Sequence, residues 1–134
     1  GSLSWLIERA RTRTTGGEFR RMLVRDDCDR IVGWFIYFAK RGGIADVLQI
    51  AATPGAAGVV IDHLIADAVR HGVAALSGRL DPSMAAELSQ RHCIFFRRGH
   101  WALVHARDRA ILAALERGDA FLSRLEGEWC LRFQ

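Results

Sequence analysis

Three stretches rich in apolar residues follow one another near the start of the chain, and each has the length of a β-strand. Ile31–Ala39 is dense in β-branched and aromatic side chains, which favours a strand buried on both faces. Glu18–Arg25 carries three arginines and is therefore expected near a sheet edge, and Ile44–Ala52 is the third strand. Short polar turns at 26–29 and 40–43 separate them, so the pattern predicts an antiparallel meander.

The hydrophobic pattern changes its period after Pro54. Apolar residues recur there with the spacing of an amphipathic helix, at Ile61, Leu64, Ile65, Ala68 and Val69. Asp67 and His71 fall on the polar side and are expected to form a solvated surface pair. Gly72 fits the position after the helix end. Val73–Leu76 then predicts a short strand parallel to the third one, because a helix crosses over between them.

The rest of the chain predicts further elements of both kinds. A short amphipathic helix is expected over 3–11, and Asp81-Pro82 is a strong start for a helix that runs to about Gln90. The later segments are a strand over His100–Ala106, a helix from Asp108 to Arg117, a short helix from Asp119 to Leu125 and a strand over Trp129–Phe133. The chain thus predicts an α+β fold, in which an antiparallel meander leads into a strand–loop–helix–strand crossover within one mixed sheet, followed by C-terminal helices and a strand.

Length and composition fit a single domain over residues 1–134. Half of the residues are apolar and a quarter are charged, which argues against disorder. The longest apolar run, Ile31–Ala39, is far shorter than the roughly 20 residues of a membrane span, and no signal peptide is visible, so no membrane association is expected. The opening Gly1-Ser2 is typical of a cloning remnant, and we therefore expect a C-terminal fragment of a longer protein.

The cysteines and the charged residues bear on the cellular compartment of the protein and on the ligands it binds. Cys28, Cys93 and Cys130 are odd in number and widely spaced, which indicates neither disulfides nor zinc, so we expect a reduced, cytoplasmic protein without a metal site. The net charge of +4 is carried by 18 arginines and one lysine, a bias typical of a GC-rich bacterial genome. No basic helix or aromatic-basic sheet pattern accompanies the arginines, so nucleic-acid binding ranks last among the functions weighed.

The candidate site is the stretch Asp46–Gly72. A strand that leads through a loop of small residues into a helix N-terminus can hold a phosphate, because the loop N–H groups and the helix dipole both point at the anion. This order of elements, together with Ile94–Trp101 (IFFRRGHW), resembles the GNAT acetyltransferase superfamily over roughly residues 3–106. The resemblance implies acetyl-CoA or another acyl-CoA as co-substrate and transfer of the acyl group to an amine. It also implies cofactor contacts at Ile50, Ala51, Ala52, Gly55, Ala56, Ala57, Gly58 and Val59.

Few residues of the sequence are candidates for a catalytic acid or base. The resemblance implies a tyrosine as acid at the position of Phe95 or Phe96, and neither of these has a hydroxyl. The sole tyrosine, Tyr37, lies in a hydrophobic strand and is interpreted as structural. Asp46 is the candidate catalytic carboxylate, acting through water, whereas Gln49 could only orient a water molecule.

Two functions from different classes follow. The first is an acyl-CoA-dependent N-acyltransferase that acts on a small-molecule or peptide amine. The second is a non-catalytic domain of this fold that serves as the partner half or interaction module of a larger protein. It is favoured by Ala52, which stands where the family expects Gln or Arg, and by the missing tyrosine. A homodimer, or an upstream domain of the same chain, is the macromolecular partner expected.

Overall fold

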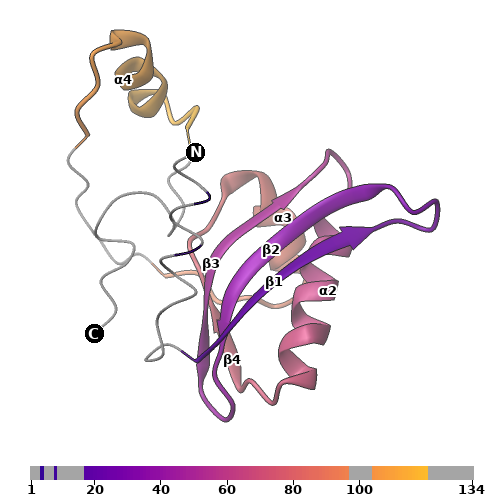
Figure 1. The fold of residues 1–134 in the computed structure, drawn as a ribbon. Helices are drawn as coiled ribbons and strands as arrows, with labels where there is room; N and C mark the ends of the chain where they lie inside the picture. Colours follow the sequence, from indigo (N-terminus) through magenta and orange to yellow (C-terminus); the bar gives the residue numbers. More distant parts are fainter. Residues whose placement is uncertain (1–3, 5–7, 9–16, 97–103, 121–134) are drawn as a thin grey trace.

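The structure is a computed structural model that describes residues 4, 8, 17–96 and 104–120 (Figure 1). Its elements are, in chain order, β1 (Glu18–Arg25), β2 (Ile31–Ala39), β3 (Ile44–Ala52), α2 (Ala57–Arg70), β4 (Ala75–Ser77), the 3-10 helix η1 (Pro82–Met84), α3 (Ala85–Gln90) and α4 (Arg109–Glu116). The bounds expected for the first three strands are confirmed. Of the helix expected over 3–11, residues 4 and 8 are helical and the others lie outside the described residues.

One mixed sheet carries the fold, with the strand order β1-β2-β3-β4. β2 pairs antiparallel with β1 and with β3, and β4 runs parallel to β3, so the meander and the parallel return after the helix are both confirmed. In the register, Phe35 lies opposite Met22 on β1 and opposite Ile50 on β3. Since directly opposed residues share a face, this register decides which side chains meet the helix.

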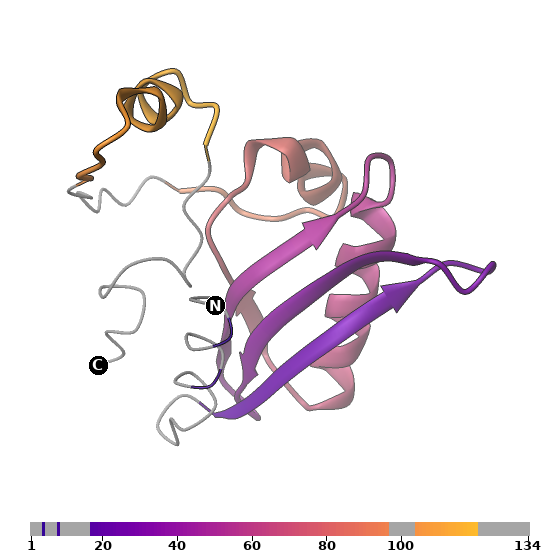
Figure 2. The ribbon, with the colours of Figure 1, turned by 45° about the horizontal axis from the view of Figure 1, so that its top comes forward.

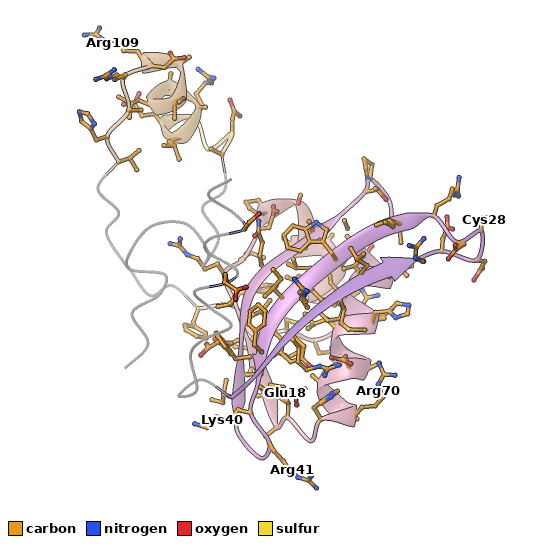
Figure 3. The ribbon with its side chains drawn as sticks, in the orientation of Figure 1. Glu18, Cys28, Lys40, Arg41, Arg70 and Arg109 are labelled. Atoms are coloured by element: carbon orange, nitrogen blue, oxygen red, sulfur yellow. The ribbon has the colours of Figure 1, made fainter. Side chains whose placement is uncertain are left out.

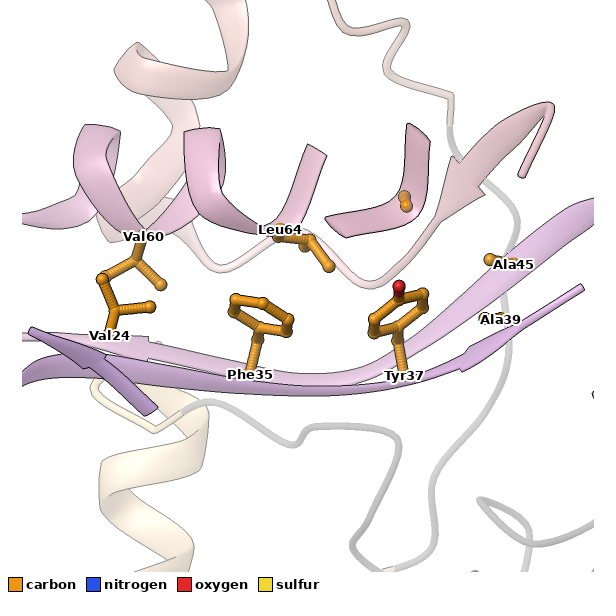
Figure 4. Packing of buried hydrophobic residues seen from close by; sticks show 8 residues of the cluster. Val24, Phe35, Tyr37, Ala39, Ala45, Val60 and Leu64 are labelled. Atoms are coloured by element: carbon orange, nitrogen blue, oxygen red, sulfur yellow. The ribbon is translucent and has the colours of Figure 1, made fainter. Parts of the chain in front are cut away.

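α2 lies across one face of the sheet and closes the main core against it (Figures 1 and 2). The buried members of this core come from all three long strands and from α2: Val24, Phe35, Tyr37, Ala39, Ala45, Val60, Leu64 and Ala68. Figure 4 shows Phe35 and Tyr37 pointing from the sheet toward the helix, beside Leu64. Burial of apolar surface contributes about 25 cal/mol per Å², so this layer holds the start of α2 firmly over the sheet.

The opposite side of the sheet, here called the second face, carries a smaller cluster. Ile36, Phe38 and Leu48 are buried there, and Phe19 and Trp34 pack against them. The rings of Phe19 and Phe38 meet edge to face, with their centroids 5.5 Å apart. β2 is therefore buried on both faces, as its composition indicated.

The buried stripe of α2 is rotated relative to the expected one. The expectation for Ile65 and Val69 is wrong, because 37% and 68% of these residues are exposed. Val60 and Asp67 are buried on α2 instead. Hydrophobic periodicity cannot predict this rotation, because it assigns every aspartate to the exposed side of a helix. An aspartate is buried only when it has partners, and the pattern does not show them. The expectation that Asp67 and His71 form a solvated surface pair is wrong for the same reason.

β4 begins two residues later than expected, at Ala75 instead of Val73. Val73 forms an isolated antiparallel bridge with Arg41, and the N–H of Gly42 donates to the carbonyl of Gly72 at 2.7 Å. The turn between β2 and β3 therefore engages the chain directly after α2, and parallel pairing with β3 starts only beyond it. Gly72 adopts a φ of +66°, the left-handed position that the sequence predicted at the helix end.

The helices after β4 begin where their capping residues predict. Asp81 accepts a hydrogen bond from the N–H of Ser83 at 2.9 Å and opens η1. Asp108 accepts one from the N–H of Ala110 at 2.8 Å and opens α4, which Gly118 follows with a φ of +75°. None of the residues of α4 is buried, and Figure 3 shows Arg109 at its start, away from the sheet.

The structure describes only some residues of the other elements predicted near the C-terminus. Within the strand expected over His100–Ala106, the described residues 104–106 belong to no strand, so the expectation is wrong there. The alternation of apolar and polar residues over so short a segment does not show whether a neighbouring strand is present to pair with it. Residues 119–120 are not helical, and the strand expected over Trp129–Phe133 lies outside the described residues. Within the described ranges, no helix has both the length and the apolar character needed to cross a membrane.

Candidate functional site

β3 and β4 run side by side only briefly. Their pairing ends at Asp46 opposite Ser77. Gly78 still lies against β3, since a Cβ atom built on it would be 3.3 Å from the Cβ of Val47. β3 then continues to Ala52, while β4 has ended. From Val47 onward, the edge of β3 on this side has no strand partner among the described residues.

A tight turn joins β3 to α2. The N–H and the Oγ1 of Thr53 both donate to the carbonyl of Val32, at 2.8 and 3.2 Å, which ties the start of the turn to β2. The N–H of Ala56 donates to the carbonyl of Thr53 at 3.0 Å, and Gly55 between them has a φ of +82°. That conformation favours glycine. No atom of the described residues lies within 4 Å of the place where a Cβ on Gly55 would stand, so this side of the turn is open toward the rest of the described chain.

The open edge of β3 presents backbone groups in front of this turn. Successive N–H groups of a strand point to opposite sides, and that of Thr53 is directed at Val32 on β2. The N–H groups of Ile50 and Ala52 therefore point away from β2, toward the side where β4 has ended. Ala51, which the resemblance also assigned to the cofactor, directs its N–H toward β2.

The first turn of α2 has no side-chain cap. Ala56 stands at the N-cap, and its methyl group offers no oxygen to the helix. The N–H groups of Ala57, Gly58 and Val59 have no acceptor within the described part of the chain. The start of this 14-residue helix therefore carries free donors and a positive partial charge. Of the residues expected to contact a cofactor, Ile50 and Ala52 thus lie on the strand edge, Gly55 and Ala56 in the turn, and Ala57, Gly58 and Val59 at the helix start, whereas Ala51 directs its N–H to β2.

Gly58 also has a packing role that the sequence did not reveal. A Cβ atom on it would approach Glu87 Oε2 to 2.6 Å and Arg91 Nη2 to 3.0 Å. The Arg91 guanidinium donates to both oxygens of Asp62, at 2.6 and 2.8 Å, to Glu87 Oε2 at 2.8 Å and to the Gly58 carbonyl at 3.1 Å. Its hydrogen bonds lower the pKa of Asp62. Two carboxylates and one guanidinium thus clamp α3 to the start of α2 and leave a net negative charge beside the free donors.

The centre of β3 contains a bulge. The register passes from Ile36 opposite Gln49 to Tyr37 opposite Val47, so Leu48 is the extra residue. Leu48 belongs to the cluster on the second face, and Gln49 shares that face because it lies opposite Ile36. The Oε1 atom of Gln49 is buried and accepts no hydrogen bond in the described part of the chain. Leaving a buried oxygen unsatisfied costs about 1–3 kcal/mol.

Asp46, the candidate catalytic carboxylate, lies near the start of β3. It is half-buried and stands opposite Phe38 on β2 and Ser77 on β4, at the point where β3 and β4 part. Because Phe38 faces the second face, Asp46 does so as well. Gln49 lies about 10 Å farther along the strand at 3.3 Å per residue.

A buried ionic network joins β1, β2 and α2 on the helix face. Asp67 accepts hydrogen bonds from Arg20 Nε and Nη2 at 2.7 and 3.0 Å and from the Tyr37 hydroxyl at 2.7 Å. Burial alone would raise the pKa of Asp67, but the hydrogen bonds from Arg20 and Tyr37 outweigh it and hold that pKa below its usual value. Burial and the bond to Asp67 raise the pKa of Tyr37. The structural interpretation of Tyr37 fits this geometry, because its hydroxyl is engaged inside the fold.

Of the segment Ile94–Trp101, the structure describes only the residues from Ile94 to Phe96. Ile94 is 87% exposed, and Phe95 and Phe96 are exposed as well. Positions 97–101 lie outside the described residues. The described part of this segment therefore supplies aromatic rings at the surface and no hydroxyl.

Comparison with known proteins assigns neither a family nor a function to this site. No protein family model, no curated protein and no solved structure matches the chain. Within the described ranges, no three His, Cys, Asp or Glu side chains gather as a metal ion would require. The function is therefore argued from the strand edge, the turn and the helix start.

Proposed function

We propose that this domain binds an acyl-CoA, in the first place acetyl-CoA, and transfers the acyl group to an amine. The observation that carries the proposal is the continuity of three features of the described chain: the edge of β3 beyond Val47, which no described strand pairs with, the turn at Gly55, and the uncapped start of α2. A turn and helix start of this kind suit the diphosphate of CoA, because their N–H groups and the helix dipole act together on the anion. The GNAT resemblance assigns the same stretch to the cofactor.

The proposed chemistry uses groups on both sides of β3. The N–H of Ile50, which points to the open edge, would donate to the thioester oxygen and make its carbon more electrophilic. Asp46 on the second face would take the proton of the attacking amine through water. The departing sulfur would receive its proton from water, since Phe95 and Phe96 carry no hydroxyl.

Calorimetric titration with acetyl-CoA tests the binding step, with desulfo-CoA and ADP as controls. Binding in the micromolar range is expected for acetyl-CoA and desulfo-CoA, and weaker binding for ADP, because ADP brings the diphosphate without the arm that follows it along the strand edge. No heat of binding from a sample shown to be folded by circular dichroism would contradict the proposal.

Ala57→Glu should weaken acetyl-CoA binding at least tenfold. A carboxylate in the first turn of α2 competes with the phosphate for the free N–H groups and repels it, while it favours the helix itself through the dipole. Ala66→Glu is the matched control, because it adds the same side chain at an exposed position of the same helix. Equal losses in the two variants would show that the start of α2 is not the phosphate site.

Glu87→Gln should have the opposite effect and tighten acetyl-CoA binding by about threefold. A unit charge at about 6 Å in water changes an equilibrium by about that factor, and Glu87 lies beside the free donors of Gly58. Calorimetry at low salt measures the gain, which should shrink at 0.5 M salt because ions screen the charge. Glu116→Gln, an exposed change on α4, should leave the affinity unchanged.

A non-catalytic binding domain is the second candidate function. It is favoured by the engagement of the Tyr37 hydroxyl with Asp67 and by the absence of a hydroxyl at Phe95 and Phe96. An assay of thiol release from acetyl-CoA in the presence of a panel of amines separates the two candidates. Amine-dependent thiol release identifies the transferase, and tight binding without thiol release identifies the non-catalytic domain.

A further inference from the structure

The end of the sheet opposite the proposed phosphate site carries exposed positive charge. Lys40 and Arg41 stand in the turn between β2 and β3, and Arg70 is the last residue of α2. Figure 3 shows these three side chains at the same end of the molecule. Lys40 and Arg41 are exposed, and so is 67% of the Arg70 side chain. Because α2 has 14 residues, this end lies about 20 Å from the first turn of the helix at 1.5 Å per residue.

The acidic groups of this region are already engaged inside the fold. Asp67 is 3% exposed and accepts two hydrogen bonds from Arg20, whereas the Arg70 guanidinium reaches it only at 3.3 Å. Glu18 pairs with the same Arg20 at 2.9 Å. Within the described part of the chain, the two cations of the turn have no acidic partner. The surface at this end is therefore positive.

The cations stand on a turn that is fixed in place and bears few side chains. The N–H of Gly42 donates to the carbonyl of Gly72 at 2.7 Å. The N–H of Ala74 donates to the carbonyl of Gly43 at 3.0 Å, so the turn is fastened to the chain after α2. The Arg41 side chain lies along Gly72, since a Cβ atom there would be 3.2 Å from its Cγ. A ligand can thus bind beside bare backbone without first ordering the turn.

Exposed apolar side chains adjoin the cations in the chain. Val69, which precedes Arg70, is 68% exposed, and Ile44, which follows the turn, is 62% exposed. Arginine beside apolar side chains is typical of protein interfaces. Nucleic acid is bound instead through many phosphate contacts along a strand, and three cations do not supply them. The composition of this surface therefore favours a peptide.

We propose that Lys40, Arg41 and Arg70 bind an acidic segment of a partner protein, one that carries an apolar residue beside its aspartates or glutamates. The carboxylates pair with the three cations, and each arginine can hold one of them through two parallel N–H groups. The apolar residue of the segment packs on Val69. The surface is separate from the proposed acyl-CoA site, so the inference does not depend on the acyl transfer.

The test follows the binding of a fluorescently labelled peptide, made of glutamates with a central leucine, by anisotropy. We expect the unaltered protein to bind it and the affinity to fall as salt is raised. The triple variant Lys40→Gln, Arg41→Gln and Arg70→Gln should bind it at least tenfold more weakly. If the unaltered protein does not bind this peptide, the proposal is wrong.

A second triple variant controls for net charge. Arg107→Gln, Arg109→Gln and Arg117→Gln remove the same charge from exposed positions on and beside α4. Figure 3 shows Arg109 far from the proposed surface. At physiological salt, charges more than about 8 Å away are largely screened, so this variant should keep its affinity for the peptide. Equal losses in the two triple variants would show that net charge alone attracts the peptide, against the proposal.

Two further measurements identify the ligand class. Val69→Ser should weaken the peptide by threefold or more, because its leucine loses an apolar contact, and should leave the binding of oligothymidylate unchanged. Tighter binding of oligothymidylate than of the peptide at equal salt would replace the proposal with nucleic-acid binding.

The affinity for acetyl-CoA distinguishes this surface from the proposed acyl-CoA site. The triple variant of Lys40, Arg41 and Arg70 should bind acetyl-CoA as the unaltered protein does. A loss of acetyl-CoA binding in this variant would assign the three cations to the acyl-CoA and overturn the separate surface. Peptide binding by a protein that does not bind acetyl-CoA would support this inference while the proposed acyl transfer fails.

Discussion

Replacing Asp67 with alanine should lower the free energy of unfolding by about 3–5 kcal/mol, the usual cost of removing one partner from a buried ion pair. Only 3% of the Asp67 side chain is exposed, and it binds Arg20 through two hydrogen bonds and Tyr37 through a third. Without the carboxylate, the Tyr37 hydroxyl loses its acceptor, and the Arg20 guanidinium keeps only one carboxylate partner, Glu18, whose side chain is 61% exposed. Urea denaturation followed by circular dichroism measures the loss.

Two companion variants show whether the loss comes from burial of the pair. Asp62→Ala removes a carboxylate of the same helix that also binds an arginine, but the Asp62 side chain is 61% exposed. It should cost less than about 1 kcal/mol. Tyr37→Phe removes one hydrogen bond and should cost about 1 kcal/mol. Similar losses for Asp67→Ala and Asp62→Ala would contradict the argument.

The same network predicts how stability depends on pH. The pKa of Asp67 in the fold is lowered, so its contribution is fully present above the pKa of an unfolded aspartate, near 3.9, and is lost as the pH falls through the lower value in the fold. The unaltered protein should therefore lose stability progressively below about pH 4. Asp67→Ala should show a smaller loss over that range, because it lacks this carboxylate. Unfolding midpoints between pH 2 and pH 7 make the comparison.

The three long strands could be read from the sequence because each is defined locally. Their apolar and aromatic runs end at polar turns. These turns are so short that each strand pairs antiparallel with the next one along the chain. α2 was found for the same reason, from the spacing of Ile61, Leu64 and Ala68. Its rotation was not found, because the burial of Asp67 depends on Arg20 and Tyr37, which lie 47 and 30 residues away. One signal was available: Arg20 and Val24 share a face of β1, and Val24 belongs to the main core.

The sequence predicted the turn and the helix start of the candidate site, but not how they pack. The small residues between Ala52 and Val59 indicated the turn and the helix start, because Gly55 fits the left-handed conformation of the turn. Gly58 shows that the same composition serves packing, since Glu87 and Arg91 stand where its side chain would be. The bulge at Leu48, which turns Gln49 to the second face, leaves no mark in the apolar pattern of β3. Features that depend on the pairing of two strands appear only once the register is known.

Replacing Gly33 with alanine should lower the free energy of unfolding by about 2–3 kcal/mol, the cost of forcing an extra group into a packed interior. Gly33 lies on β2 opposite Ala52, the last residue of β3 before the turn. A Cβ atom on it would clash with the Cγ2 of Val60 on α2 and with the carbonyl oxygen of Ala51. Val60 is fully buried and Ala51 is part of the sheet, so neither can move aside cheaply.

The effect of Gly33→Ala should reach the candidate site as well as the core. Val60 lies in the first turn of α2, so relief of the clash moves the helix start away from the open edge of β3. We therefore expect weaker acetyl-CoA binding in the folded fraction of this variant, together with a lower urea midpoint. Gly43→Ala is the matched control, because the three atoms nearest to its Cβ all belong to the flexible side chain of Lys40. It should stay within about 1 kcal/mol of the unaltered protein. If the two variants were equally stable, the contact between Gly33 and Val60 would not be what sets the height of α2 above the sheet.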